Sequence, residues 1–219
     1  DFMVSKPIDP PSAWARNIYC SMALALTGIL VYGNHLHNTF QFDSITYIKN
    51  NLSLKNPESI LTFQFWMSEF FARGLLSISM ALNAHLDEMR PFGYHLVNLA
   101  LHIFNSILVF YIFKKALLHF KNSIGKNDAA ISFFAATIFL VHPIQTESVI
   151  YIISRSEVLA STFYLLGFLL FQTCLELHNR HSLLKKIILP LVILFLIVVG
   201  FSVKQTLATF PLIIFLYYI

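Results

Sequence analysis

The sequence predicts an all-α, polytopic membrane protein, a helical bundle with about six membrane segments. Hydrophobic residues make up 57% of the chain and charged residues only 12%, whereas about a quarter of the residues in ordinary soluble domains are charged. The mean hydropathy is +0.67. Several apolar runs approach about 20 residues, the length at which a helix crosses a bilayer core about 30 Å thick.

The apolar runs place the membrane segments along the chain. The first begins at Trp14, whose amphipathic ring suits a membrane interface, and the second begins after Pro91, a residue typical of helix starts. Charged or proline-containing stretches separate the later runs. The expected segments are 14–36, 92–113, 129–141, 158–175, 187–201 and 205–219.

The long connection 37–91 forms the first outer loop. Residues 60–86 carry many aromatic and aliphatic side chains, but the opposite charges of Glu69 and Arg73 interrupt them. One or two helices lying in the interface plane explain this stretch better than a membrane span. We also expect a short surface element at 45–51.

The chain resembles a piece of a longer protein. It begins at Asp1, and the apolar run 210–219 has no polar end. We therefore expect residues 1–219 to form the N-terminal part of a larger membrane domain, with a C-terminal remainder outside this sequence. Cys20 and Cys174 fall in apolar runs, which favours small packed side chains over a disulfide.

The distribution of Lys and Arg predicts the orientation, since cytoplasmic connections carry an excess of these residues. With a cytoplasmic N-terminus, most basic residues lie on the cytoplasmic side. Asp43, Glu147, Arg155 and Lys204 then share the extracytoplasmic face. The residues expected on the cytoplasmic side are Lys6, Arg16, Lys114, Lys115, Lys121, Lys126, Arg180, Lys185 and Lys186.

This shared face predicts a site. Asp43 follows the first membrane segment, where lipid meets water, and is the candidate reacting group. A lipid-linked phosphate would be a suitable ligand, bound by the cationic side chains of Arg73, Arg155 and Lys204. Structural alternatives stand beside these roles: Asp43 as a cap or a solvated side chain, a Glu147–Arg155 ion pair, and Lys204 extending to the interface.

Polar residues inside the second segment have a structural interpretation. Asn98 and His102 are expected to make interhelical hydrogen bonds. His35 and His37 lie near Asp43, but helical spacing would separate them by about 200°, which argues against a metal pair.

Several local patterns occur in a distinctive order along the chain. They are Phe40-Gln41-Phe42-Asp43 with Asn50-Asn51, Ala72 to Ser79, Pro91 to Leu99 with His102, His142 to Val149, Ser154 to Ala160, and Ser202 to Gln205. In this order they resemble one known family, the transmembrane and tetratricopeptide-repeat O-mannosyltransferases and their bacterial relatives. The resemblance covers nearly the whole chain, and a bacterial relative is expected.

The resemblance implies a C-type glycosyltransferase fold in which the chain is the N-terminal membrane half. In that family the first outer loop carries an acidic motif, commonly two adjacent acids; Asp43 matches the first, while Ser44 replaces the second. Gly74 and Gln145 also replace a family proline and histidine. His142 and Glu147 match the family block and, together with Ser44, are expected to support the site.

The implied reaction moves a sugar, expected to be mannose, from a polyprenyl-phosphate carrier to a hydroxyl acceptor with inversion. Asp43 would be the base, and Arg73, Arg155 and Lys204 would bind the donor phosphate. The expected acceptor is a protein Ser or Thr, or else a glycan. The scheme requires no cofactor, leaves room for a divalent metal, and involves membrane lipid but no nucleic acid.

The expected location is the extracytoplasmic face of an integral membrane protein: the periplasmic side of a bacterial inner membrane, or the lumen of the endoplasmic reticulum in a eukaryote. Two other classes stay open. A lipid or solute transporter could use the same charges as a coupling pathway, and a non-catalytic scaffold would fit the loss of the second acid at Ser44.

Overall fold

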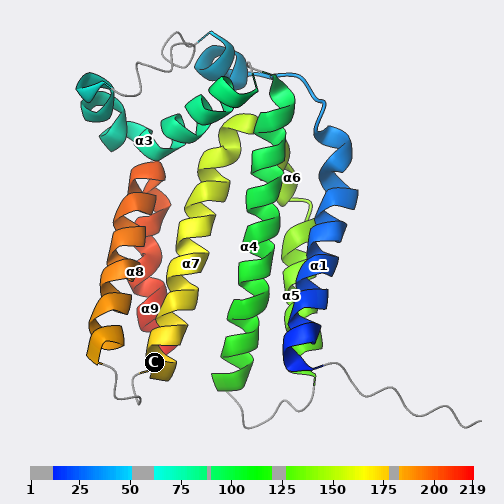
Figure 1. Cartoon of the computed structure of the whole chain (residues 1–219), viewed down its shortest axis with the longest axis vertical. Helices are drawn as coiled ribbons and strands as arrows, with labels where there is room; N and C mark the ends of the chain where they lie inside the picture. Colours follow the sequence, from blue (N-terminus) through cyan, green and yellow to red (C-terminus); the bar gives the residue numbers. More distant parts are fainter. Residues whose placement is uncertain (1–11, 51–61, 88–89, 120–126, 178–182) are drawn as a thin grey trace, which may run out of the picture.

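The structure is a computed structural model that describes residues 12–50, 62–87, 90–119, 127–177 and 183–219. These residues form helices and turns, and no strand occurs among them. Figure 1 shows α1, α4, α5, α7, α8 and α9 side by side along the long axis, with α3 lying across one end. The predicted all-α bundle is confirmed.

The helices follow one another with short breaks. Their bounds, in chain order, are α1 (Ala13–Tyr32), η1 (Gly33–His35), η2 (Ile45–Lys49), α3 (Phe63–Leu86), α4 (Pro91–His119), α5 (Asp128–Val141), α6 (Gln145–Ile150), η4 (Ile152–Ser154), α7 (Arg155–Leu177), α8 (Leu183–Val203), η5 (Gln205–Thr209) and α9 (Phe210–Tyr218).

Each predicted membrane segment falls largely on helical residues, although 14–36 continues from α1 into η1 and 205–219 is divided between η5 and α9. Four helical stretches in the described residues are long and apolar enough to cross a membrane: Ala13–His35, Pro91–His119, Ile152–Glu176 and Lys186–Val203. The stretches 128–141 and 205–218 are apolar but shorter. The orientation of α3 across the bundle end agrees with the interfacial helix expected for the first outer loop (Figure 1).

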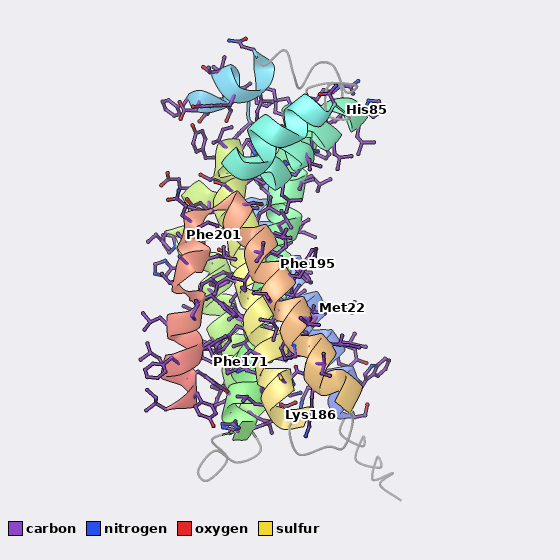
Figure 2. All side chains as sticks on the ribbon, turned by 90° about the vertical axis from the view of Figure 1, so that its left-hand side faces the viewer. Met22, His85, Phe171, Lys186, Phe195 and Phe201 are labelled. Atoms are coloured by element: carbon purple, nitrogen blue, oxygen red, sulfur yellow. The ribbon has the colours of Figure 1, made fainter. Side chains whose placement is uncertain are left out.

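The two ends of the bundle differ in what they carry. We call the end covered by α3 the α3 end; it holds the 33–50 connection, the start of α4, and the connections 142–154 and 204–209. Arg16, Lys114, Lys115 and Lys186 lie at the opposite end, as the predicted charge partition requires. Figure 2 shows the same polarity, with His85 and Lys186 near opposite ends and Phe195 between them.

Helix α4 packs against α1, α5, α6 and α7 through a buried stripe of polar side chains. His102 Nε2 lies 3.0 Å from the Leu140 carbonyl, and Ser106 donates to the Ala136 carbonyl, both on α5. Asn105 donates to the Val158 carbonyl on α7, and Asn98 to the Ile152 carbonyl. The prediction of interhelical hydrogen bonds from Asn98 and His102 is confirmed.

A proline explains why the Leu140 carbonyl is open to these contacts. Helix α5 ends at Val141 because Pro143 pushes His142 into an extended conformation (ψ 131°). The carbonyls of the last helical turn then need partners from outside the helix. The Tyr32 hydroxyl donates to the Leu140 carbonyl at 3.0 Å, beside His102, so three helices are joined at one oxygen.

Close approach of α1 to α4 yields a first testable prediction. A side chain added at Gly28 would lie 2.6 Å from Ile103 Cγ1, whereas one at Gly33 would meet only Ile29 Cγ2, at 3.9 Å. We expect Gly28→Leu to destabilise the bundle by about 1–3 kcal/mol through overpacking. Thermal unfolding in detergent micelles measures it, with Gly33→Leu as the matched control. Equal losses in both variants would contradict the packing.

Candidate functional site

The centre of the α3 end is the buried side chain of Arg155, the first residue of α7, which is 0% exposed. Its guanidinium donates to Asn98 Oδ1 at 2.8 Å and to Asn83 Oδ1 at 2.6 Å. It also donates to the backbone carbonyls of Ser79 and Tyr94, both at 3.0 Å. Arg155 thereby joins α3, α4 and α7.

These partners are neutral oxygens, so within the described residues the charge of Arg155 is solvated by amide and carbonyl groups and is not paired with a carboxylate. The guanidinium carbon also lies 5.4 Å from the centre of the Tyr94 ring, a cation–π contact. Burial of a charge costs several kcal/mol unless its hydrogen bonds are satisfied. Arginine suits this position because its planar fork presents several donors in fixed directions.

The position of Arg155 corrects two expectations. It was expected to bind a donor phosphate, but its side chain is fully buried and its donors are directed at Asn83, Asn98 and two carbonyls. The alternative ion pair with Glu147 is not formed either, since Glu147 is exposed and none of these partners is a carboxylate. The sequence identified Arg155 as a charge at this end of the bundle. The direction in which its side chain points depends on the amides of Asn83 on α3 and Asn98 on α4.

Asn98 connects Arg155 to the segment that supports Asp43. Its amide nitrogen donates to the Ile152 carbonyl at 3.3 Å and lies 3.5 Å from the Tyr151 carbonyl. The Tyr151 hydroxyl in turn accepts a hydrogen bond of 3.1 Å from the backbone N–H of Asp43. A continuous chain of contacts therefore leads from the buried arginine to the candidate base.

Asp43 lies at the water-exposed surface of the α3 end. Its carboxylate makes no hydrogen bond or ion pair with any residue that the structure describes, so it is available to accept a proton. The preceding residue, Phe42, has φ 47° and is 80% exposed. A bulky residue in this left-handed region is strained, and such strain concentrates at functional sites.

Hydrophobic anchors on both sides fix the loop around Asp43. The Phe40 ring packs edge-on against the Tyr94 ring, with 5.5 Å between centroids, and Ile48 is fully buried against α3 and α4. The Phe42 ring packs edge-on against Tyr151 at 6.3 Å. The loop is therefore held at several points while the carboxylate stays exposed.

A cavity of about 500 Å³ lies between the start of α7 and the end of α8. Lys204 and Glu157 form an ion pair in its wall, and both side chains are partly exposed. Hydroxyl side chains add hydrogen-bonding groups. The lining residues are Ile153, Ser154, Ser156, Glu157, Phe201, Ser202, Val203, Lys204, Gln205 and Thr206.

The cavity and Asp43 are connected by one stretch of chain. Residues 151–157 carry the Tyr151 hydroxyl that holds Asp43 and, from Ile153 to Glu157, part of the cavity wall. Asp43 itself is not among the lining residues. The structure thus brings Asp43 and Lys204 to the same end of the bundle, at two neighbouring surfaces joined by this stretch.

The other predicted site residues whose side chains the structure describes are not among those that line the cavity. His142 is exposed, and its Nδ1 accepts a hydrogen bond from the Ile144 N–H, so it caps the break after α5. Glu147 is exposed in the first turn of α6. Ser44 is buried next to Asp43. Arg73 falls within α3, and its side chain lies outside the described part of the structure.

Sequence reasoning missed Asn83, Tyr151 and Glu157 as parts of the site. Asn83 accepts from Arg155, Tyr151 holds Asp43, and Glu157 pairs with Lys204. Only Asn83 gave a usable signal, because an amide in an apolar helix needs a polar partner. Among the described residues, no group of three or more His, Cys, Asp or Glu side chains is arranged as a metal site.

These features define a class: a multi-pass helical membrane protein with a polar, partly charged site at one end of the bundle. Comparison with known proteins narrows it. The chain is 32% identical over 165 residues to the protein O-mannosyl-transferase TMTC1 of Mus musculus, and 33% identical over 165 residues to TMTC3 of Homo sapiens; each match covers 70% of this chain. Over 77% of its own length, this chain is also 30% identical to the protein O-mannosyl-transferase F38B6.6 of Caenorhabditis elegans.

The predicted resemblance is confirmed: the chain is a relative of the TMTC protein O-mannosyl-transferases and corresponds to their membrane half. It spans 17% of the mouse TMTC1 protein, 17% of human TMTC3 and 25% of the nematode protein. No family model and no solved structure matches the chain. These relatives are animal proteins, and the bacterial origin expected from the sequence stays a prediction.

The hydrogen bonds of Arg155 generate a stability prediction. We expect Arg155→Met to destabilise the protein by about 3 kcal/mol or more, because each buried acceptor left without a donor costs about 1–3 kcal/mol. Arg155→Lys should recover only part of the loss, since an ammonium group cannot reproduce the fork. Thermal unfolding in micelles measures both.

Arg16→Met provides the matched control, because Arg16 is exposed at the opposite end of the bundle. A surface change of this kind is expected to stay within about 0.5 kcal/mol. If Arg155→Met unfolds at the same temperature as Arg16→Met, the assignment of Arg155 as the organising residue is wrong.

Proposed function

We propose that this chain is part of a membrane glycosyltransferase that moves mannose from a polyprenyl-phosphate carrier to the hydroxyl of a protein Ser or Thr at the extracytoplasmic face. The relatives are named protein O-mannosyl-transferases, which supports the sugar and the acceptor. The observation that carries the proposal is the exposed carboxylate of Asp43, held on a strained turn at the same bundle end as the Lys204 cavity.

The reaction assigns one proton transfer to Asp43. The carboxylate accepts the proton of the acceptor hydroxyl while that oxygen attacks the anomeric carbon of the sugar. The bond from that carbon to the carrier phosphate breaks, and the phosphate leaves with the electron pair on the opposite face, so the anomeric configuration inverts. Asp43 ends the step protonated and returns its proton to water. An exposed position suits this role, because the acid must exchange with solvent after each turnover.

Lys204 is the cation proposed to face the leaving phosphate. It lies in the wall of the 500 Å³ cavity, paired with Glu157. Negative charge grows on the phosphate oxygens as the bond breaks, and a fixed cation stabilises that change. Glu157 holds the ammonium group in the cavity wall before the donor arrives. The phosphodiester of the donor carries one negative charge, and the released polyprenyl phosphate carries up to two, so its attraction to Lys204 increases as the bond breaks.

Two further assignments follow from the expected orientation. The α3 end faces the extracytoplasmic side, and the carrier lipid lies in the membrane beside α8, whose outer surface carries exposed apolar side chains such as Phe195 and Phe201 (Figure 2). Arg155 supports the reaction as a positioning residue, through Asn98 and Tyr151. The proposal requires no cofactor and leaves a divalent metal open.

The first test removes the proposed base. In the full-length protein in membranes, Asp43→Asn should lower transfer of labelled mannose from polyprenyl-phosphate mannose to protein by about 10²–10⁴-fold, the usual contribution of a general base. Asp128→Asn is the matched control, because Asp128 lies at the opposite end, in the first turn of α5. Equal transfer by Asp43→Asn and wild type at equal expression would refute the role.

The second test concerns the phosphate. Lys204→Met should raise the KM for the polyprenyl-phosphate donor and also lower kcat, with a combined loss in kcat/KM of about 10–100-fold, since a hydrogen bond from a charged donor contributes about 1.5–3 kcal/mol. The KM for the acceptor should stay unchanged. Lys186→Met, an exposed lysine at the other end of the bundle (Figure 2), is the control. An unchanged kcat/KM for the donor would place the phosphate elsewhere.

A further inference from the structure

Two buried polar atoms beside Asp43 lack a hydrogen-bond partner in the described part of the chain. They are the hydroxyl oxygen of Ser44 and Nδ1 of His95, whose residues are 1% and 4% exposed. Buried polar atoms are nearly always hydrogen-bonded, because leaving one unsatisfied forfeits its hydration without compensation. Because both residues line one small cavity, one small polar partner there would satisfy both atoms.

Both residues line the same small cavity, which the 38–44 loop, His95 on α4 and the 150–152 stretch enclose. The cavity offers about 10 Å³ to the centre of a water molecule. About 10–15 Å³ by this measure admits one water. A single water fits the volume, and larger ligands do not.

The hydrogen bond at Nε2 of His95 determines whether Nδ1 needs a donor or an acceptor as its partner. Nε2 lies 3.1 Å from the Asn38 carbonyl oxygen, which can only accept, so Nε2 carries the proton. In the neutral ring Nδ1 is then an acceptor that requires a donor. The Ser44 hydroxyl can both donate and accept, so a water between the two atoms donates to Nδ1 and accepts from Ser44.

We propose that one buried water bridges the Ser44 hydroxyl to His95 Nδ1, and that His95 is the positioning residue of the loop that carries Asp43. His95 contacts the loop at both ends: directly at Asn38 through Nε2, and through the water at Ser44. Asp43 adjoins the second of these points. This inference rests on the proposed function for its catalytic consequence, but the water bridge itself does not.

Substitutions can separate the two contacts of His95. A glutamine places its amide nitrogen near the position of Nε2, so His95→Gln keeps a donor for Asn38 and loses the acceptor for the water. An asparagine places its amide oxygen near Nδ1, so His95→Asn keeps the acceptor and loses the Asn38 contact. Ser44→Ala removes the other end of the water bridge only.

The experiment is a double-mutant cycle in the full-length protein in membranes, with kcat for mannose transfer and hydrogen exchange of the loop amides as readouts. Ser44→Ala and His95→Gln should each lower kcat and speed loop exchange by about tenfold, the scale of one hydrogen bond. The double variant should be no worse than either single variant, because both break the same bridge. The donor KM should not change.

Two control cycles test whether the coupling is specific. Ser44→Ala with His95→Asn should be additive, because these variants break different contacts. Ser132→Ala with His95→Gln should also be additive, since Ser132 is buried on α5 and bonds its own helix at Asp128. A purely structural role of His95 would make all three cycles behave alike.

The outcomes separate this inference from the proposed function. Coupling in exchange without any mannose transfer by wild type supports the bridge and refutes the function. Transfer by wild type with an additive Ser44→Ala, His95→Gln cycle overturns the bridge and leaves the function standing. In a cryo-EM map of the full-length protein, density within hydrogen-bonding distance of both atoms would support the water. A direct bond from Ser44 to Nδ1 with nothing between them would overturn it.

Discussion

The buried charge of Arg155 is the constraint on which the α3 end depends. A guanidinium with no exposed surface must be solvated by protein oxygens, and here these come from α3 and α4 while the arginine itself begins α7. The crossing of these three helices brings those oxygens around the guanidinium. Through Asn98 the constraint reaches Tyr151, and through Tyr151 it reaches the backbone of Asp43. One electrostatic requirement therefore fixes both the helix crossing and the turn that presents the carboxylate.

Further from the site, hydrogen bonds between neighbouring helices hold the bundle together, although the outer surfaces of these helices are apolar. In lipid the hydrophobic effect contributes little to helix association, so packing and interhelical hydrogen bonds contribute more. The stripe on α4 meets this need: His102, Asn105 and Ser106 each contact a backbone carbonyl of a neighbouring helix. The carbonyl used by His102 is open because Pro143 ends α5. A rigid frame results, and the strained Phe42 turn can be maintained on it.

In the candidate site, a loop that is packed against the core presents an exposed carboxylate. Phe40 and Ile48 anchor the loop in the core while Phe42 and Asp43 stay at the surface. The cavity with Lys204 and Glu157 is built separately, from the start of α7 and the end of α8. The 151–157 stretch serves both, since it holds Asp43 at one end and lines the cavity at the other.

Sequence alone determined the membrane class, the helix positions and the end of the bundle at which the ionisable residues gather. Hydrophobic run length and charge distribution are local properties, so they can be read without a fold. The motifs also indicated the relationship to the O-mannosyl-transferases. Only the tertiary structure decided where each polar group points. Arg155 turns into the protein and Lys204 into a cavity, although both are cations at the same end, because the amides of Asn83 and Asn98 surround the first and the carboxylate of Glu157 faces the second. These partners come from distant parts of the chain or from a neighbouring helix, and no sequence spacing specifies them.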